Sequence, residues 1–283
     1  MIVARTRIGL AEALPRLRAG GRSVGLVPTM GYLHEGHLSL VEYAAARVDA
    51  VAVSIFVNPL QFGPAEDLAE YPRDEARDLT LLEDRGVAVA FVPSVEEMYP
   101  LGGPRVTIAP GSMAERLCGA FRPGHFRGVL TVVAKLFGLF RPDVAVFGRK
   151  DFQQAVLIRR MARDLDMGVQ ILMAPTVREG DGLAMSSRNA YLSPEERTQA
   201  VGLFKALSAA LERFASGERS AAALREAALG VLAHYPLLRP QYLEIVDPDT
   251  LEPADPVAAG SVLAAAVFCG RTRLIDNMEF GQT

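Results

Sequence analysis

Short apolar runs alternate with amphipathic stretches over the first two thirds of the chain. The runs are nearly continuous, as expected of strands covered on both faces, and they begin near residues 24, 49, 87, 143 and 169. Apolar residues at helical spacing fill the intervals, notably at 73–84, 128–140 and 152–164. This alternation predicts an α/β fold, a doubly wound, Rossmann-like sheet of five parallel strands with helices on both faces.

The pattern changes near residue 188. Ser193 and Pro194 are a favoured helix cap and first helical residue, and Ala-rich helices then run to about residue 233. Apolar segments at 241–246, 261–268 and 273–276 predict short antiparallel strands. We therefore expect two domains, residues 1–188 with the parallel sheet and a smaller α+β domain at 189–283. Between 93 and 121, where glycine and proline interrupt the chain, only 105–109 resembles a strand.

Composition narrows the function classes. Half of the 283 residues are hydrophobic and 22% are charged, which is typical of a globular protein. The net charge of −3 predicts no basic surface for nucleic acid. Cys118 and Cys269 are too few and too far apart for a disulfide framework or a Cys-rich metal site. Because neither a secretory signal nor a long apolar run is evident, we expect a cytoplasmic protein with no membrane segment.

The strongest chemical signal lies between residues 24 and 41. An apolar run is followed by a turn and then by a helical pattern, and His34 and His37 lie where the helix is expected to begin. Such a turn presents unpaired N–H groups and the positive end of the helix dipole, which suits a phosphate. Neither common Gly-rich phosphate motif is present, so the two histidines themselves would bind the phosphate, and Gly36 would allow close approach. The alternative is two ordinary histidines at a helix start.

Two further segments carry candidate anion ligands. In the first, Met185-Ser186-Ser187-Arg188 places two hydroxyls beside a guanidinium, a combination that can follow the charge on a departing pyrophosphate. Glycines at 180 and 182 indicate a mobile loop before it. In the second, the positive charge of Lys150 lies at a helix start, where it interacts unfavourably with the helix dipole. The cost is about a few tenths of a kcal/mol, and an anion bound there would explain it. Asp151 is expected to cap that helix.

Together, these motifs resemble the nucleotidylyl-transferase superfamily of ATP-using enzymes. With the segments at 56–62, 122–129 and 147–154 in the same order, the chain resembles the pantothenate synthetase family from about Val24 to Leu192. The resemblance implies an ATP-dependent ligase that condenses (R)-pantoate with β-alanine through a pantoyl adenylate. It implies MgATP as co-substrate, no prosthetic group, a homodimer, and a C-terminal domain that acts as a lid.

The resemblance also implies the site residues. Those expected to act in catalysis are His34, His37, Lys150 and Arg188. Those expected to line the ATP site are Met30, Gly31, Tyr32, Leu33, His34, Glu35, Gly36, His37, Gly148, Arg149, Lys150, Asp151, Val177, Met185, Ser186, Ser187 and Arg188. Those expected to bind pantoate or β-alanine are Gln61, Gln154, Asn58 and Pro28.

Several of these assignments leave an alternative open. Gln61 is otherwise an exposed loop amide, and Asp78, which matches a family acid associated with magnesium, otherwise belongs to a solvated helix face. Arg149 departs from the family, which often has an acid there. His125 and Arg127 either contact substrate or brace the following helix.

Three rival functions make different demands on the sequence. A transferase acting on a phosphorylated small molecule would need basic residues in place of the two glutamines. A relative of the aminoacyl-tRNA synthetases would need a basic face. A nucleotide sensor would be expected to lack at least one charged phosphate ligand, and none is missing from the motifs.

Overall fold

The computed structural model describes residues 1–64 and 66–281, which form two compact units. The first unit contains residues 1–111, 122–148 and 157–175, and the second contains 112–121, 149–156 and the chain from Thr176 onward. The last of these segments begins at Thr176 and not at residue 189. The loop at 176–185 belongs to the second unit because it is bonded to partners further along the chain, as Arg178 is to Asp276. The domains proposed from the sequence stay a prediction.

The first unit is built on a parallel sheet whose strand order is β1-β4-β3-β2-β5-β6. The strands are β1 (Ile2–Ala4), β2 (Val24–Thr29), β3 (Ala50–Ile55), β4 (Val89–Phe91), β5 (Val144–Gly148) and β6 (Gln170–Ala174). The five predicted strands are confirmed. The sixth, β1, was not predicted; it is a three-residue edge strand that pairs with β4.

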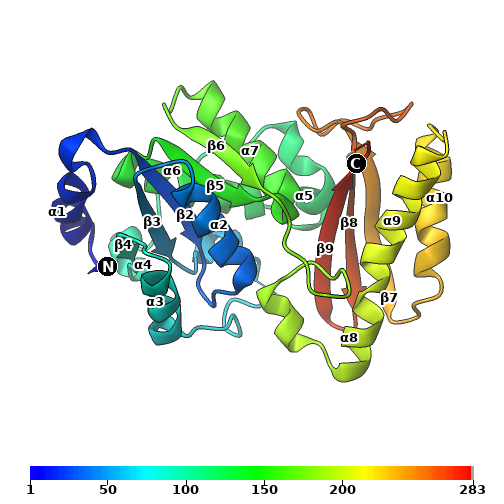
Figure 1. Ribbon diagram of the computed structural model, residues 1–283, viewed down its shortest axis with the longest axis horizontal. Helices are drawn as coiled ribbons and strands as arrows, with labels where there is room; N and C mark the ends of the chain where they lie inside the picture. Colours follow the sequence, from blue (N-terminus) through cyan, green and yellow to red (C-terminus); the bar gives the residue numbers. More distant parts are fainter. Residues whose placement is uncertain (65, 282–283) are drawn as a thin grey trace. The chain divides into compact units, whose positions relative to one another are not determined.

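Helices cover both faces of this sheet, which confirms the doubly wound fold (Figure 1). The helices with residues in the first unit are α1 (Arg7–Leu17), α2 (Glu35–Ala45), α3 (Glu75–Asp84), α4 (Val95–Met98), α6 (His125–Phe140) and α7 (Phe152–Asp164), and the short 3-10 turns are η1 (Ala19–Gly21) and η2 (Pro59–Gln61). On one face, Leu38 and Val41 of α2 share a buried cluster with Val53 of β3. On the other face, the ring of Phe140 of α6 lies 5.8 Å from that of Phe91.

The strand order reverses between β2 and β5. From β2 the chain adds strands β3 and β4 to one side of the sheet, whereas β5 and β6 extend the other side. In open α/β sheets, ligands bind beyond the carboxyl ends of the strands at such a reversal. His34 follows the carboxyl end of β2, and Arg149 follows that of β5.

The strand predicted at 105–109 is wrong. No strand is described there, and Val106 is 85% exposed. The Ile108 N–H donates to a side chain, the Thr131 hydroxyl oxygen, at 3.0 Å. An apolar alternation indicates an extended chain, but a strand also needs a partner strand, which local sequence does not reveal.

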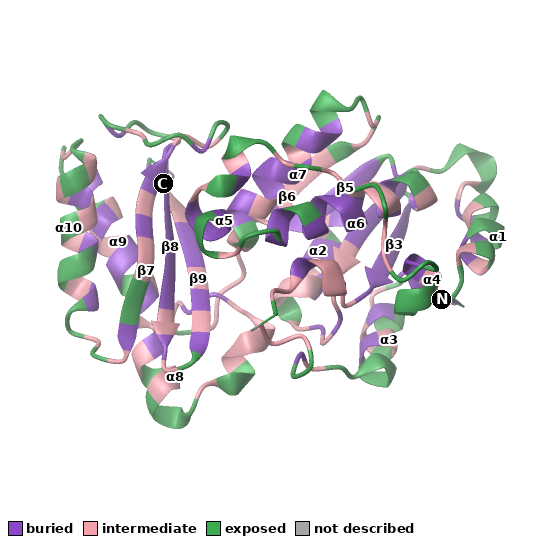
Figure 2. Cartoon of the chain, turned by 180° about the vertical axis from the view of Figure 1, so that it is seen from behind, coloured by how far each residue is buried: buried purple, intermediate pink, exposed green. Residues whose placement is uncertain are grey.

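The second unit contains an antiparallel sheet in the order β7-β8-β9. Its strands are β7 (Leu238–Val246), β8 (Val262–Cys269) and β9 (Thr272–Glu279), and its helices are α5 (Leu117–Phe121), α8 (Pro194–Ala200), α9 (Gly202–Ala215) and α10 (Ala221–Leu232), with 3-10 turns η3 (Ser112–Glu115), η4 (Arg149–Asp151) and η5 (Ser187–Tyr191). Figure 2 shows β8 buried over nearly its whole length. Leu207 of α9 and Leu263 of β8 belong to one core cluster. Among the helices that the structure describes, none has both the length and the apolar character of a membrane span.

Candidate active site

A tight turn joins β2 to α2 and carries the predicted histidine motif. Gly31 and Tyr32 both have positive φ angles, 81° and 51°, so the backbone reverses sharply before His34. His34 is the N-cap of α2, and its Nδ1 accepts a hydrogen bond from the Gly36 N–H at 3.1 Å. The Nδ1 atom of His37 accepts from the His34 N–H at 3.3 Å. The two side chains thus complete a capping box at the helix start.

These hydrogen bonds fix the tautomers of both histidines. A backbone N–H can only donate, so each Nδ1 is an acceptor and each neutral ring carries its proton on Nε2. The ring centroids are 4.1 Å apart. The arrangement therefore provides two neighbouring N–H donors at the positive end of a helix, which is suited to phosphate oxygens.

Asp78 of α3 holds this turn in place. Its Oδ2 accepts from the Tyr32 N–H and its Oδ1 from the Leu33 N–H, both at 2.7 Å, while Arg77 donates to the Leu33 carbonyl at 2.9 Å. Asp78 is 1% exposed, so its assignment to a solvated helix face is wrong. Burial raises the pKa of Asp78, and the two N–H bonds oppose that rise. The carboxylate acts as a structural brace for the segment that carries His34.

Gln61, at the end of η2, is only 9% exposed, so it is not a solvent-facing loop amide. Its Oε1 accepts from Asn58 Nδ2 at 3.1 Å, and its Nε2 donates to the Met30 sulfur at 3.1 Å. Asn58 is itself oriented by the Tyr99 hydroxyl, which donates to Asn58 Oδ1 at 2.9 Å. This chain of contacts sets the direction of the Gln61 amide.

The start of α6 supports η2 from the other side. The Nδ1 atom of His125 lies 2.8 Å from the Gln61 carbonyl, and its Nε2 lies 3.0 Å from Arg122 Nη1. Because arginine only donates, Nε2 accepts and Nδ1 carries the proton that is donated to the carbonyl. Arg122 also forms a two-point ion pair with Glu66, at 2.7 and 2.5 Å. His125 thus braces the Gln61 segment, whereas Arg127 is exposed.

In the second unit, η4 carries the predicted Lys150. Asn277 of β9 donates to the carbonyls of Arg149 and Lys150, and Glu279 forms an ion pair with the Arg149 side chain. Asp151 is the last residue of η4, is exposed, and directly precedes α7, so its capping role stays a prediction.

The loop that carries the Met185–Arg188 motif folds back on itself. Arg178 and Ala184 form an antiparallel bridge, and the Met185 N–H donates to the Val177 carbonyl at 3.0 Å. Arg178 is held by Asp276 through two hydrogen bonds, at 2.6 and 3.1 Å. Ser186 then caps η5, and its hydroxyl oxygen accepts from the Arg188 N–H. The two predicted loop glycines therefore belong to a tight hairpin.

Comparison with known proteins decides the family. The model of the pantoate–beta-alanine ligase family matches residues 2–279. The chain belongs to this family. The pantothenate synthetase of Thermoanaerobacter pseudethanolicus is 52% identical over 282 residues, which cover 100% of this chain and 99% of that protein. That of Chloroflexus aggregans is 55% identical over 269 residues, covering 95% of this chain and 96% of its own.

Solved structures agree with the family assignment. The pantothenate synthetase of Thermus thermophilus superposes with a TM-score of 0.94 at 49% identity and covers 99% of both chains. The pantoate–beta-alanine ligase of Francisella tularensis, solved as a complex with beta-gamma ATP and beta-alanine, gives a TM-score of 0.81 at 32% identity, over 100% of this chain and 99% of that one. The family resemblance found in the motifs is confirmed.

The site residues predicted from the sequence belong partly to the first unit and partly to the second. Those in the first unit are Pro28, Met30 to His37, Asn58, Gln61, Asp78 and Gly148, and those in the second are Arg149 to Asp151, Gln154, Val177 and Met185 to Arg188. Gln154 is half-buried, and its ligand role stays a prediction. Its neighbour Gln153 is buried and donates to the carbonyls of Met113 and Arg116.

Among residues 1–64 and 66–281, no group of three or more His, Cys, Asp or Glu side chains is placed so that it could hold a metal ion. Both oxygens of Asp78 already accept backbone hydrogen bonds, and the side chain is buried. This geometry does not suit Asp78 as a magnesium ligand.

Sequence reasoning missed the residues that hold the predicted ligands. Asp276 is the last residue of the short strand predicted at 273–276, and Asn277 and Glu279 lie just beyond that prediction, within β9. The one signal in the motif itself is the charge of Arg149, which pairs with Glu279 in the structure.

Proposed function

We propose that this chain is an ATP-dependent pantoate–beta-alanine ligase. It condenses (R)-pantoate with β-alanine to pantothenate through a pantoyl adenylate and releases AMP and pyrophosphate. The observation that carries the proposal is the pair of Nε2–H donors at the start of α2, in a chain of this family.

The reaction has two steps. First, the carboxylate of pantoate attacks the α-phosphate of MgATP in line and expels pyrophosphate. Second, the amine of β-alanine attacks the acyl carbon of the adenylate, and AMP leaves. Both nucleophiles come from the substrates, so the protein contributes positioning and charge stabilisation and needs no covalent intermediate of its own.

The phosphate ligands have distinct roles in this proposal. His34 and His37 donate from Nε2 to phosphate oxygens, and the Lys150 ammonium and the Arg188 guanidinium neutralise charge that builds up as pyrophosphate departs. Ser186 and Ser187 add hydroxyl donors. The remaining predicted ATP contacts are Met30 to Leu33, Glu35, Gly36, Gly148, Arg149, Asp151, Val177 and Met185.

Gln61 and Gln154 are the proposed pantoate ligands, with Pro28 beside them. In support, the Gln61 amide is held in one orientation by Asn58 and Met30. Asn58 uses its polar atoms on Gln61, Leu60, Tyr99 and Gly128, so we place it behind the ligand rather than against it. A transferase acting on a phosphorylated substrate would require cations where this chain has the two glutamines.

The test is pyrophosphate release by the purified protein with MgATP alone, with added pantoate, and with pantoate plus β-alanine. We expect release that requires pantoate and turns over rapidly only with β-alanine. ATP binding without release under any condition would favour a nucleotide sensor and overturn the proposal.

Single substitutions test the role assignments. Lys150→Ala or His37→Ala should lower adenylate formation by about a hundredfold or more, the scale of losing one preorganised charge contact. Gln61→Ala should weaken the use of pantoate more than that of ATP. Steady-state kinetics with each substrate varied in turn measures both effects, and rates within a few fold of the parent would contradict the assignments.

We also propose that the chain works as a cytoplasmic homodimer and that residues 189–283 act as a lid during catalysis. These points follow from the family alone. Sedimentation velocity tests the dimer, and protection of this domain from proteolysis by ATP plus pantoate tests the lid.

A further inference from the structure

Strand β9 presents two different faces within the second unit. Successive side chains of a strand point to opposite sides, so Leu274 and Met278 lie on one face and Asn277 and Glu279 on the other. Leu274 is 4% exposed and belongs to the core cluster, against which Met278 packs. The opposite face carries polar side chains that reach η4. The strand therefore joins the core of the unit to the turn that holds Lys150.

Asn277 forms hydrogen bonds to the backbone of this turn. Its Nδ2 donates to the Arg149 carbonyl at 2.9 Å and to the Lys150 carbonyl at 3.0 Å. Carbonyl oxygens only accept, so the orientation of the amide is fixed by its surroundings. Its Oδ1 is buried and finds no hydrogen-bond partner among the described residues. A buried acceptor without a partner costs free energy. The cost is explained here because turning the amide round to pair Oδ1 would break both hydrogen bonds that Nδ2 makes to η4.

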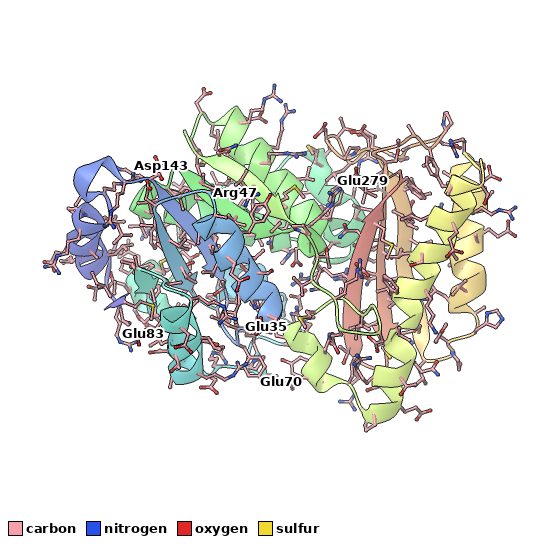
Figure 3. All side chains as sticks on the ribbon, viewed as in Figure 1. Glu35, Arg47, Glu70, Glu83, Asp143 and Glu279 are labelled. Atoms are coloured by element: carbon pink, nitrogen blue, oxygen red, sulfur yellow. The ribbon has the colours of Figure 1, made fainter. Side chains whose placement is uncertain are left out.

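Glu279 holds the same turn by a second route. Its carboxylate pairs with the Arg149 side chain, and Figure 3 labels it at the end of β9. One strand thus fixes η4 by its carbonyls through Asn277 and by a side chain through Glu279. Neither contact involves the side chain of Lys150.

We propose that Asn277, supported by Glu279, is a positioning residue for Lys150 in adenylate formation. The inference rests on the proposed role of Lys150 as a ligand of the ATP phosphates. The lysine side chain is long and flexible, so the position of its ammonium group depends on how firmly its backbone is held. A charge contact that is displaced by about 1 Å loses much of its catalytic effect. Asn277 fixes the backbone at the point where that side chain begins.

The test is a double-mutant cycle on pantoate-dependent pyrophosphate release, with the variants Asn277→Ala, Lys150→Ala and the pair. We expect Asn277→Ala to lower kcat by about tenfold or more and to change KM for ATP by less, because a misplaced ammonium loses transition-state contact above all. In the Lys150→Ala background, the same change should lower the rate by less than about twofold.

A second variant and a control separate positioning from general damage. Asn277→Asp keeps the size of the side chain but turns an acceptor toward two carbonyls, so it should be at least as slow as Asn277→Ala. Leu274→Val trims a core side chain on the opposite face of β9, away from η4. It should lower the thermal midpoint of unfolding and leave kcat within about twofold of the parent.

The outcomes are distinguishable. If Lys150→Ala slows release strongly but Asn277→Ala does not, or if the two losses multiply, the positioning role is overturned while the proposed function stands. If Lys150→Ala itself leaves release within a few fold, the proposed role of Lys150 fails, and this inference fails with it.

Discussion

The proposed phosphate donors owe their positions to single side chains that bond to backbone. At the residue scale, Asp78 is the clearest case, because one carboxylate binds two consecutive N–H groups in the turn before His34. A carboxylate has two acceptor oxygens, whereas a carboxamide has one acceptor and one donor. The turn therefore requires two acceptor oxygens at this position, which a carboxamide of the same size does not provide.

Asp78→Asn should disturb the turn. The amide NH₂ would face the N–H of Tyr32 or Leu33, which leaves a buried donor unpaired and lowers the free energy of unfolding by about 1–3 kcal/mol. Adenylate formation should fall at least tenfold, because His34 follows directly. Chemical denaturation and pyrophosphate release measure the two effects.

The matched control is Asp74→Asn in the same helix. Asp74 is the N-cap of α3, and its side chain accepts from the Arg77 N–H. Asparagine caps helices about as well as aspartate, so this variant should behave like the parent. Equal losses in both variants would mean that the effect arises from the charge of α3 and not from the turn.

At the scale of elements, the contact between α6 and η2 shows why one helical glycine matters. A Cβ atom built on Gly128 would lie 2.2 Å from the Leu60 carbonyl oxygen and 2.7 Å from the Gln61 backbone nitrogen. Glycine disfavours a helix interior by about 1 kcal/mol relative to alanine. Its presence here therefore reflects the close approach of η2 to the helix.

Gly128→Ala should push η2 away from α6 and displace Gln61. We expect KM for pantoate to rise about tenfold or more, with a smaller change in KM for ATP. The control is Gly138→Ala in the same helix, where an added Cβ meets nothing within 4 Å. That variant should leave both KM values unchanged and raise stability slightly. Kinetics with pantoate varied compares them, and equal behaviour of the two variants would contradict the proposed docking.

The elements show where sequence reasoning succeeds. The five predicted strands lie in nearly continuous apolar runs and the helices between them have helical periodicity, so they could be predicted, and the histidine and Met185–Arg188 motifs are contiguous in the chain. The three-residue β1 and the unpaired 105–109 segment depend on partner strands that local sequence does not specify.

The supports of the site could not be predicted for the same reason. Asn277 lies 128 residues from Arg149 along the chain, and Asp78 lies 45 from Leu33. An asparagine in a strand or an aspartate in a charged helix gives no local sign of such a partner. Motifs therefore revealed the residues proposed to contact substrate, whereas only the fold revealed the residues that hold them.

At the scale of the whole molecule, carboxylates that bond to backbone or arginine link stability to pH. The Val24 N–H, at 2.7 Å from Asp143 Oδ2, and then Arg18 lower the pKa of Asp143, which Figure 3 labels. The Arg197 side chain likewise lowers the pKa of Asp181. A lowered pKa in the folded state stabilises the fold above the unfolded-state value of about 4, and this contribution is lost as the pH falls through the folded-state pKa.

Asp143→Asn tests this link, because the variant cannot ionise at this position. At pH 7 its free energy of unfolding should be lower than that of the parent by about 1 kcal/mol or less, since the side chain is half-exposed and its charge is screened. As the pH falls below the unfolded-state value of about 4 and then through the lowered folded-state pKa, the parent protonates and loses the same contribution, so the difference should shrink toward zero. Denaturant titrations at several pH values measure it, with the exposed Asp84→Asn as control. A difference that stays constant as the parent is titrated to full protonation would show that Asp143 acts through shape and not through its charge.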